Sequence, residues 1–64
     1  MTGRELKRFI VFNDVYCYNV AKKIGMSEQT LIRRFRLDEV PTDLIQQVKP
    51  AIKELTGKEP KTID

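Results

Sequence analysis

The sequence VAKKIGMSEQTLIRRF, residues 20–35, contains two short amphipathic segments joined by a tight corner. Ala21 is small, and Gly25 follows it in the corner itself. Two helices that meet at a steep angle across a short turn need a small side chain on the first helix and a glycine in the turn. This spacing predicts a helix-turn-helix, and the alternative is an unrelated helical corner with charged outer faces. The apolar residues that could hold one helix across the other are Val20, Ile24, Met26 and Leu31.

The first helix of this corner is expected over residues 16–24. It should end at Gly25, because glycine adopts the left-handed conformation that commonly follows a helix. Ser27 is predicted to cap the second helix, expected over residues 28–36, and an acidic side chain in the first turn suits the helix dipole. The apolar pair one turn apart on this second helix is Leu31 and Phe35.

Another helix is predicted before the corner, over residues 3–12. Thr2 followed by Glu5 is a capping box, in which each side chain accepts a hydrogen bond from a backbone amide at the start of a helix. Asn13 and Asp14 should end this helix, because their short side chains bond the local backbone. The apolar positions at helical spacing are Leu6, Phe9 and Ile10.

After the corner, Pro41 predicts a loop, because it forces the preceding residue out of the α region. Thr42 or Asp43 could cap the helical segment that follows. Pro50 leaves two possibilities open: one helix kinks there, or a short helix ends and Pro50 begins a fifth one. Gly57 should end the helical part. The apolar set of this last segment is Leu44, Ile45, Val48, Ala51, Ile52 and Leu55.

These signals predict an all-α fold of four or five helices, with a helix-turn-helix domain over residues 1–57 and a flexible tail over residues 58–64. A chain of 64 residues is one small domain, which buries only about 60% of its unfolded surface. Histidine is absent and Cys17 is the only cysteine, so we expect no disulfide, no metal site and no cofactor. No apolar run is long enough to span a bilayer, and the expected location is the cytoplasm. Nothing in the pattern indicates an enzyme, because no group is present to activate a serine or the cysteine.

The order of these elements, read with MSEQTLIRRF at residues 26–35, resembles the helix-turn-helix of the Cro/CI-like (XRE-type) regulators of temperate phages and bacteria. The resemblance covers about residues 4–56. It implies a lambda-repressor-like domain that binds a double-stranded DNA operator in a bacterial host cell, as a homodimer on half-sites about one helical turn apart. Val11 and Phe12, or apolar residues of the last helix, are candidates for the dimer contact.

The resemblance also implies roles for the outward residues of the corner. Gln29 can pair with an adenine edge, and Arg33, one turn further along the same face, can reach a guanine or a phosphate. Thr30 offers a hydroxyl and a methyl group for base or backbone contact. Lysines before the turn, together with Arg36, are better placed for phosphates. The complete predicted surface is Lys22, Lys23, Ser27, Glu28, Gln29, Thr30, Arg33, Arg34 and Arg36.

Charge is distributed unevenly along the chain. Residues 1–36 carry eight basic and three acidic side chains, a balance of +5, whereas residues 37–64 carry four basic and six acidic ones, a balance of −2. Such asymmetry is typical of a basic face that meets a polyanion, and the alternative is an ordinary solvated surface.

Departures from the family pattern motivate a second hypothesis. The family's phosphate-binding glutamine is replaced by Cys17, which we interpret as a small core residue, and Glu28 puts a negative charge at the start of the recognition helix. The protein could instead be an interaction module, a modulator or antirepressor that binds a phage repressor and blocks its DNA-binding surface. Tyr16 and Tyr18 could serve such an interface or stack on a base, but packing or a hydroxyl-to-backbone bond is the favoured interpretation.

Overall fold

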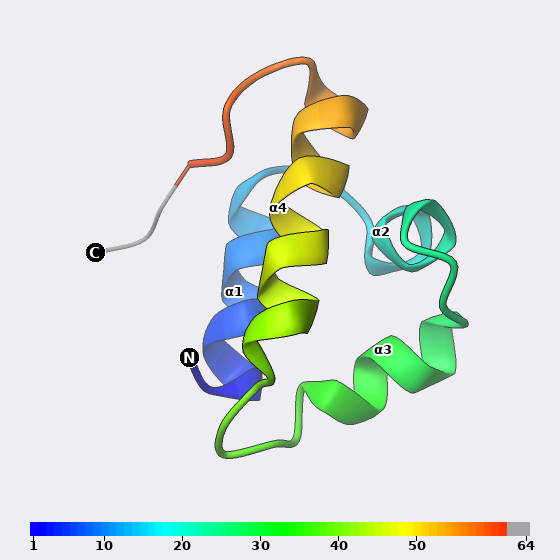
Figure 1. The fold of residues 1–64 in the computed structure, drawn as a ribbon. Coiled ribbons are helices and arrows are strands. Elements are labelled where there is room, and N and C mark those ends of the chain that lie inside the picture. Colours follow the sequence, from blue (N-terminus) through cyan, green and yellow to red (C-terminus); the bar gives the residue numbers. More distant parts are fainter. Residues whose placement is uncertain (62–64) are drawn as a thin grey trace.

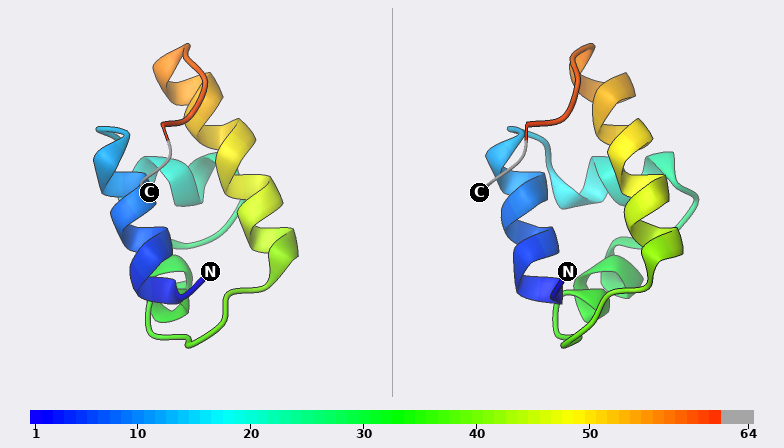
Figure 2. Two further views of the ribbon diagram at one scale, coloured as in Figure 1. Left: turned by 90° about the vertical axis from the view of Figure 1, so that its left-hand side faces the viewer. Right: turned by 60° about the vertical axis from the view of Figure 1, so that its left-hand side comes forward.

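The computed structural model describes residues 1–61, which form four α-helices and no strand (Figure 1). The prediction of an all-α domain is confirmed, and the four-helix alternative is the correct one. Helix α2 packs against each of the other three helices, and the turned views show it between α1 and α4 (Figure 2). The helices are α1 (Gly3–Phe12), α2 (Cys17–Lys23), α3 (Glu28–Arg34) and α4 (Thr42–Thr56).

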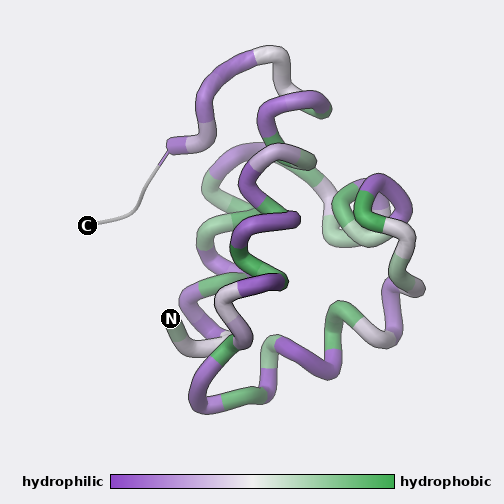
Figure 3. The backbone as a smooth tube through the Cα atoms, viewed as in Figure 1, coloured by the Kyte–Doolittle hydropathy of each residue, from purple (hydrophilic) through white to green (hydrophobic). Residues whose placement is uncertain are grey.

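The core draws on all four helices and on the loop before α4. Hydrophobic positions recur along α1 and α4, separated by hydrophilic ones, so that each helix has one apolar side (Figure 3). Burial of these sides in the common core supplies the main driving force for folding. The buried core residues are Leu6, Phe9, Ile10, Val20, Ala21, Leu31, Val40, Leu44, Val48, Ala51 and Ile52.

The boundaries of α1 are as predicted. The Thr2 hydroxyl accepts a hydrogen bond from the Glu5 amide at 3.1 Å, and the Glu5 carboxylate accepts one from the Thr2 amide, also at 3.1 Å. This reciprocal pair satisfies two amides that have no partner inside the helix. At the other end Asn13 is the C-cap, and Asp14 has a φ of 58°, a conformation that aspartate tolerates in turns.

The corner between α2 and α3 has the predicted construction. Ala21 is buried in the core, and its carbonyl accepts a hydrogen bond from the Met26 amide at 2.9 Å across the turn. Gly25 has a φ of 77°, the left-handed conformation that glycine adopts without strain. Ser27 caps α3, since its hydroxyl accepts a hydrogen bond from the Thr30 amide at 3.2 Å. Helices α2 and α3 are thus joined by a short turn and packed against each other.

Both corner helices are shorter than predicted. Tyr16 lies before α2 as its N-cap, without a side-chain hydrogen bond, and Ile24 lies after the helix as its C-cap. The end of α3 tightens, because the amides of Phe35, Arg36 and Leu37 each bond the carbonyl three residues back. Arg36 therefore lies on a turn rather than on α3.

Helix α4 is a single helix with Pro50 inside it, so the alternative of a fifth helix is wrong. Pro50 is exposed, and the core side chains on either side of it keep their helical spacing. The predicted cap at Thr42 or Asp43 is also wrong, because both residues lie in the first turn and Pro41 occupies the N-cap without a side-chain bond. Among the described residues, α4 is the longest helix, and none is long and apolar enough to cross a membrane.

The chain beyond α4 returns toward α1. Gly57 ends the helix with a φ of 72°, as predicted, and its amide bonds the carbonyl of Lys53. Lys61 then forms two backbone hydrogen bonds with the side chain of Asn13. The division into a domain over residues 1–57 and a flexible tail over residues 58–64 stays a prediction, and residues 62–64 of that tail lie outside the described residues.

Candidate nucleic-acid interface

The outward face of α3 is formed by Gln29 and Arg33. Leu31 is fully buried and Phe35 packs against the core, which fixes the rotation of the helix. Gln29 and Arg33 lie one turn apart on the opposite side, and both are exposed. Their amide and guanidinium groups therefore face solvent on the same side of the helix, and we call this pair the α3 ridge.

The two hydroxyls at the start of α3 are occupied within the chain. The Ser27 and Thr30 oxygens lie 2.7 Å apart, and the Ser27 oxygen also accepts from the Thr30 amide. Thr30 is half-buried, whereas Ser27 is exposed. Because these bonds use part of the hydrogen-bonding capacity of each hydroxyl, less of it is left for an external partner. We therefore assign Ser27 and Thr30 a structural role in the corner rather than a role in ligand binding.

The basic residues of the predicted surface are all exposed, but their surroundings differ. Lys23 reaches across to α4, where its ammonium lies 3.0 Å from the Glu54 carboxylate. Within residues 1–61, the other basic residues of this surface form no ion pair. Lys22 is thus the better candidate for a phosphate contact from α2. The unpaired basic residues of the surface are Lys22, Arg33, Arg34 and Arg36.

Beside the α3 ridge lies a second feature, which we call the aromatic hollow. It is an open depression of about 420 Å³ between the start of α2, one flank of α3 and the side of α1. The Glu28 side chain lines this hollow and is not part of the α3 ridge formed by Gln29 and Arg33. The residues that line it are Lys7, Tyr16, Cys17, Tyr18, Asn19, Glu28, Ile32 and Phe35.

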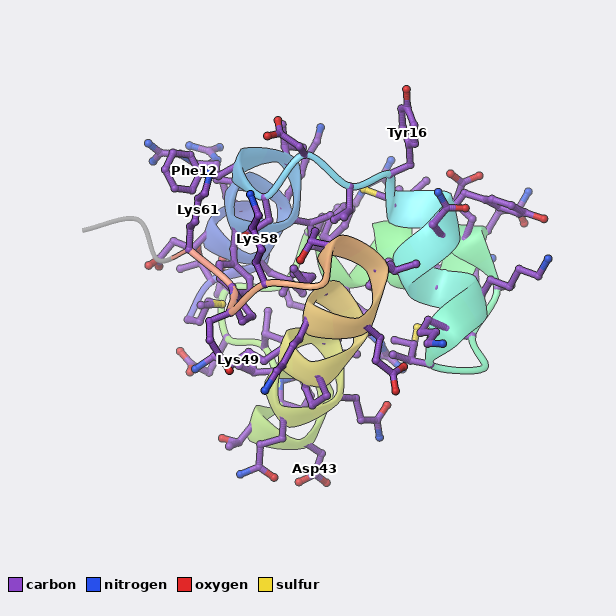
Figure 4. The ribbon with its side chains drawn as sticks, turned by 90° about the horizontal axis from the view of Figure 1, so that it is seen from above. Phe12, Tyr16, Asp43, Lys49, Lys58 and Lys61 are labelled. Atoms are coloured by element: carbon purple, nitrogen blue, oxygen red, sulfur yellow. The ribbon has the colours of Figure 1, made fainter. Side chains whose placement is uncertain are left out.

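The tyrosines of the aromatic hollow are exposed, which contradicts the favoured interpretation that they are packed or bonded to the backbone. Tyr16 is 77% exposed and Tyr18 is 55% exposed, and neither hydroxyl forms a hydrogen bond within residues 1–61. Figure 4 shows the Tyr16 ring directed away from the helices. Their exposure arises because Cys17, between them, is the residue that turns toward the core.

The thiol of Cys17 is poorly suited to nucleophilic chemistry. Burial raises its pKa above the ordinary value of 9.0, the nearby Lys7 ammonium lowers it, and the Glu28 carboxylate raises it further. The thiolate is the reactive form, so a raised pKa leaves the group mostly protonated near neutral pH. Within residues 1–61, no cluster of three or more histidine, cysteine or acidic side chains is arranged to hold a metal ion.

Sequence reasoning missed three lining residues of the aromatic hollow, which are Lys7, Asn19 and Ile32. Ile32 is exposed one turn after Glu28, so the helical spacing of these two residues could have indicated a second face of α3. Lys7 could not have been found in this way, because only the packing of α1 brings it near α2.

The geometry defines the class of protein as a small all-α domain built around a helix-turn-helix. No protein family matches this chain, and no curated protein or solved structure shows significant similarity to it. The arguments about function below therefore rest on the chain's own residues.

Proposed function

We propose that this protein is a sequence-specific DNA-binding transcription regulator of the Cro/CI-like (XRE-type) kind, acting in the cytoplasm of a bacterial cell. Helix α3 would enter the major groove, with Gln29 reading an adenine and Arg33 a guanine or a phosphate. Lys22 and the arginines that flank the ridge would bind phosphates and fix the orientation of the domain.

The observation that carries this proposal is the α3 ridge itself. Gln29 and Arg33 share the exposed face opposite Leu31, on a helix joined to α2 by a tight turn. These two side-chain types are the ones that form bidentate contacts with adenine and guanine in the major groove. The basic balance of residues 1–36 supplies the electrostatic attraction that sequence-independent binding requires.

One domain of this size covers only a short DNA site, so we propose that it binds as a twofold homodimer on paired half-sites. Leu55 near the end of α4 is 39% exposed and lies outside the core, which makes the end of α4 the candidate for the dimer contact.

The test is a selection from a random duplex library, followed by titration of the enriched sequence by fluorescence anisotropy at several salt concentrations. We expect one enriched motif with two half-sites, and an affinity that falls log-linearly with salt. Equal, weak binding to every duplex would contradict sequence-specific regulation.

A second candidate function is favoured by the exposure of Tyr16 and Tyr18. Tyrosine is enriched at the energetic centres of protein interfaces, and here two exposed tyrosines line a hollow at the flank of α3. In this proposal the protein would bind a repressor and cover its DNA-binding surface. Co-purification with the repressor of a neighbouring divergent gene, weakened by Tyr16→Ser, together with no enrichment from the duplex library, would favour the second function over the first.

A further inference from the structure

Helix α1 has an exposed stripe that the fold does not use. Its core side is formed by Leu6, Phe9 and Ile10. On the opposite side, side chains at positions i, i+3, i+4 and i+7 form a continuous row, with one further aromatic residue beside it. We call this set the α1 stripe, and its members are Arg4, Lys7, Arg8, Val11 and Phe12.

The charge of the α1 stripe is unbalanced. Within residues 1–61, none of its three cations forms an ion pair. Glu5 is the only acidic side chain of α1; its carboxylate bonds the Thr2 amide at the start of the helix and lies near enough to Arg8 to interact with its charge, but within residues 1–61 the two form no ion pair. Three positive charges therefore face solvent side by side, which raises the local positive potential and favours an anionic partner.

The apolar end of the α1 stripe is exposed. Val11 is 56% exposed and Phe12 is 48% exposed, and Figure 4 shows the Phe12 ring at the outer edge of the molecule. Together with the cations they line an open depression of about 620 Å³. Lys7 lines both this depression and the aromatic hollow, so the two lie next to each other.

We propose that the α1 stripe binds an acidic amphipathic helix of another protein. The carboxylates of that helix would pair with the guanidinium groups of Arg4 and Arg8, and its apolar side chains would cover Val11 and Phe12. Opposite charges set the orientation of such a complex, and the apolar contact supplies its centre. The helix would cross the Lys7 ammonium and place a large apolar side chain at the aromatic hollow beside it.

The alternative occupants fit the α1 stripe less well. A second copy of this chain would bring the same three cations to the contact without an acidic stripe to match them. A DNA backbone would pair with the cations but would leave Val11 and Phe12 without an apolar partner. A lipid surface needs a broad apolar face, and the broad apolar face of α1 is already buried in the core.

The test is a selection of random peptides of about 15 residues, long enough to form a helix, displayed on phage against the whole protein. A double variant, Arg8→Glu with Phe12→Ser, serves for counter-selection. The selected peptides are expected to carry net negative charge and apolar residues at helical spacing. The wild-type chain should bind them at least about tenfold more tightly than the double variant does.

The matched control is Lys49→Glu with Leu37→Ser, which makes the same charge change on α4 and removes an exposed apolar side chain that follows α3. This control should bind the selected peptides as the wild-type chain does. Circular dichroism melts of both double variants should stay close to that of the wild type, because all four positions are exposed.

Several outcomes would overturn the proposal. They are an absence of enriched acidic peptides, equal binding of them by the α1 double variant, or a dimer in sedimentation that only the α1 double variant abolishes. Loss of affinity for duplex DNA in the α1 double variant, without any enriched peptide, would assign the stripe to DNA instead. The proposal does not depend on the α3 ridge, so failure of the duplex selection leaves it standing.

Discussion

The side chain of Asn13 binds both backbone polar groups of Lys61, across 48 residues of sequence. Its amide nitrogen donates to the Lys61 carbonyl at 3.0 Å and to the Phe9 carbonyl at 2.8 Å, and its oxygen accepts from the Lys61 amide at 2.7 Å. Asn13 is only 6% exposed and is the one buried polar residue in the described chain. One amide group thus closes the end of α1 and attaches the segment that follows α4.

Replacement of Asn13 with alanine should therefore destabilise the domain by about 1–3 kcal/mol, because buried polar groups lose their partners. Urea denaturation followed by circular dichroism measures this change. Asn19→Ala is the matched control, since the Asn19 side chain is exposed and forms no hydrogen bond within residues 1–61, and it should change stability by less than about 0.5 kcal/mol. Equal stability of the two variants would show that the Lys61 contact contributes nothing.

Gly3 lies where the start of α1 meets the end of α3. Its amide donates to the Leu37 carbonyl at 2.8 Å, and a β-carbon at Gly3 would overlap the backbone carbonyl groups of Arg34 and Phe35. Gly3→Ala should therefore destabilise the domain by about 1–3 kcal/mol, although the same change in an open helix stabilises it by up to about 1 kcal/mol. A lower free energy of unfolding in Gly3→Ala would support the close approach of Gly3 to the end of α3, and a higher one would contradict it.

A comparison with Gly25→Ala separates steric overlap from backbone strain. A β-carbon at Gly25 meets no other atom, so only the positive φ penalises alanine there, by about 1–2 kcal/mol. Gly25→Asn should destabilise the domain less than Gly25→Ala does, because asparagine tolerates the left-handed conformation. At Gly3, where φ is not the difficulty, asparagine should be at least as harmful as alanine. A milder effect of asparagine at both glycines would contradict this distinction.

The elements that the sequence predicted well are those specified by local chemistry. The Thr2 and Glu5 capping box, the Ser27 cap and the Gly25 turn each depend on residues within a few positions of one another. Their side chains have few alternative partners at that range, so the boundaries of α1 and the start of α3 followed directly.

The features that could not be predicted depend on contacts between distant segments. Neither the bond between Asn13 and Lys61 nor the position of Lys7 beside α2 has a local signal. The continuity of α4 through Pro50 was also undecided locally, because a proline at an exposed position removes one hydrogen bond without disturbing the buried face. Tertiary packing decided each of these points.

For the DNA-binding proposal, Arg33→Ala and Lys22→Ala should differ in kind. Arg33 lies on the α3 ridge, so Arg33→Ala should weaken the free energy of DNA binding by about 1–3 kcal/mol and reduce the preference for one base at a single operator position. Lys22 lies on α2 without an ion pair in residues 1–61, so its loss should weaken all duplexes alike and reduce the salt slope by about 1. Anisotropy titrations against a panel of single-base operator variants measure both effects, with Lys49→Ala on α4 as the control. Identical profiles for the two variants would contradict base reading by Arg33.

The capping box makes stability depend on pH through Glu5. Hydrogen bonds from the Thr2 amide and then the Thr2 hydroxyl lower the pKa of Glu5 below its ordinary value of 4.5. A carboxyl group with a lowered pKa stabilises the folded state above the ordinary pKa, and that contribution is lost as the pH falls through the folded pKa. Glu5→Gln should therefore be less stable than the wild type at neutral pH, and the difference should shrink steadily below about pH 4.5. Denaturation midpoints across this range measure it, and a constant difference would contradict the assignment.

The aromatic hollow can be probed through the reactivity of Cys17. Burial, and secondarily the Glu28 carboxylate, raise the pKa of the thiol, whereas the Lys7 ammonium lowers it. Alkylation by iodoacetamide at about pH 8 should therefore be slower in the folded chain than in urea, because a smaller fraction is thiolate. Glu28→Gln should accelerate the reaction of the folded chain, and Lys7→Gln should slow it. Opposite changes of this kind would place both charges beside the sulfur atom, whereas equal rates in the two variants would contradict the arrangement of α1, α2 and α3 around the hollow.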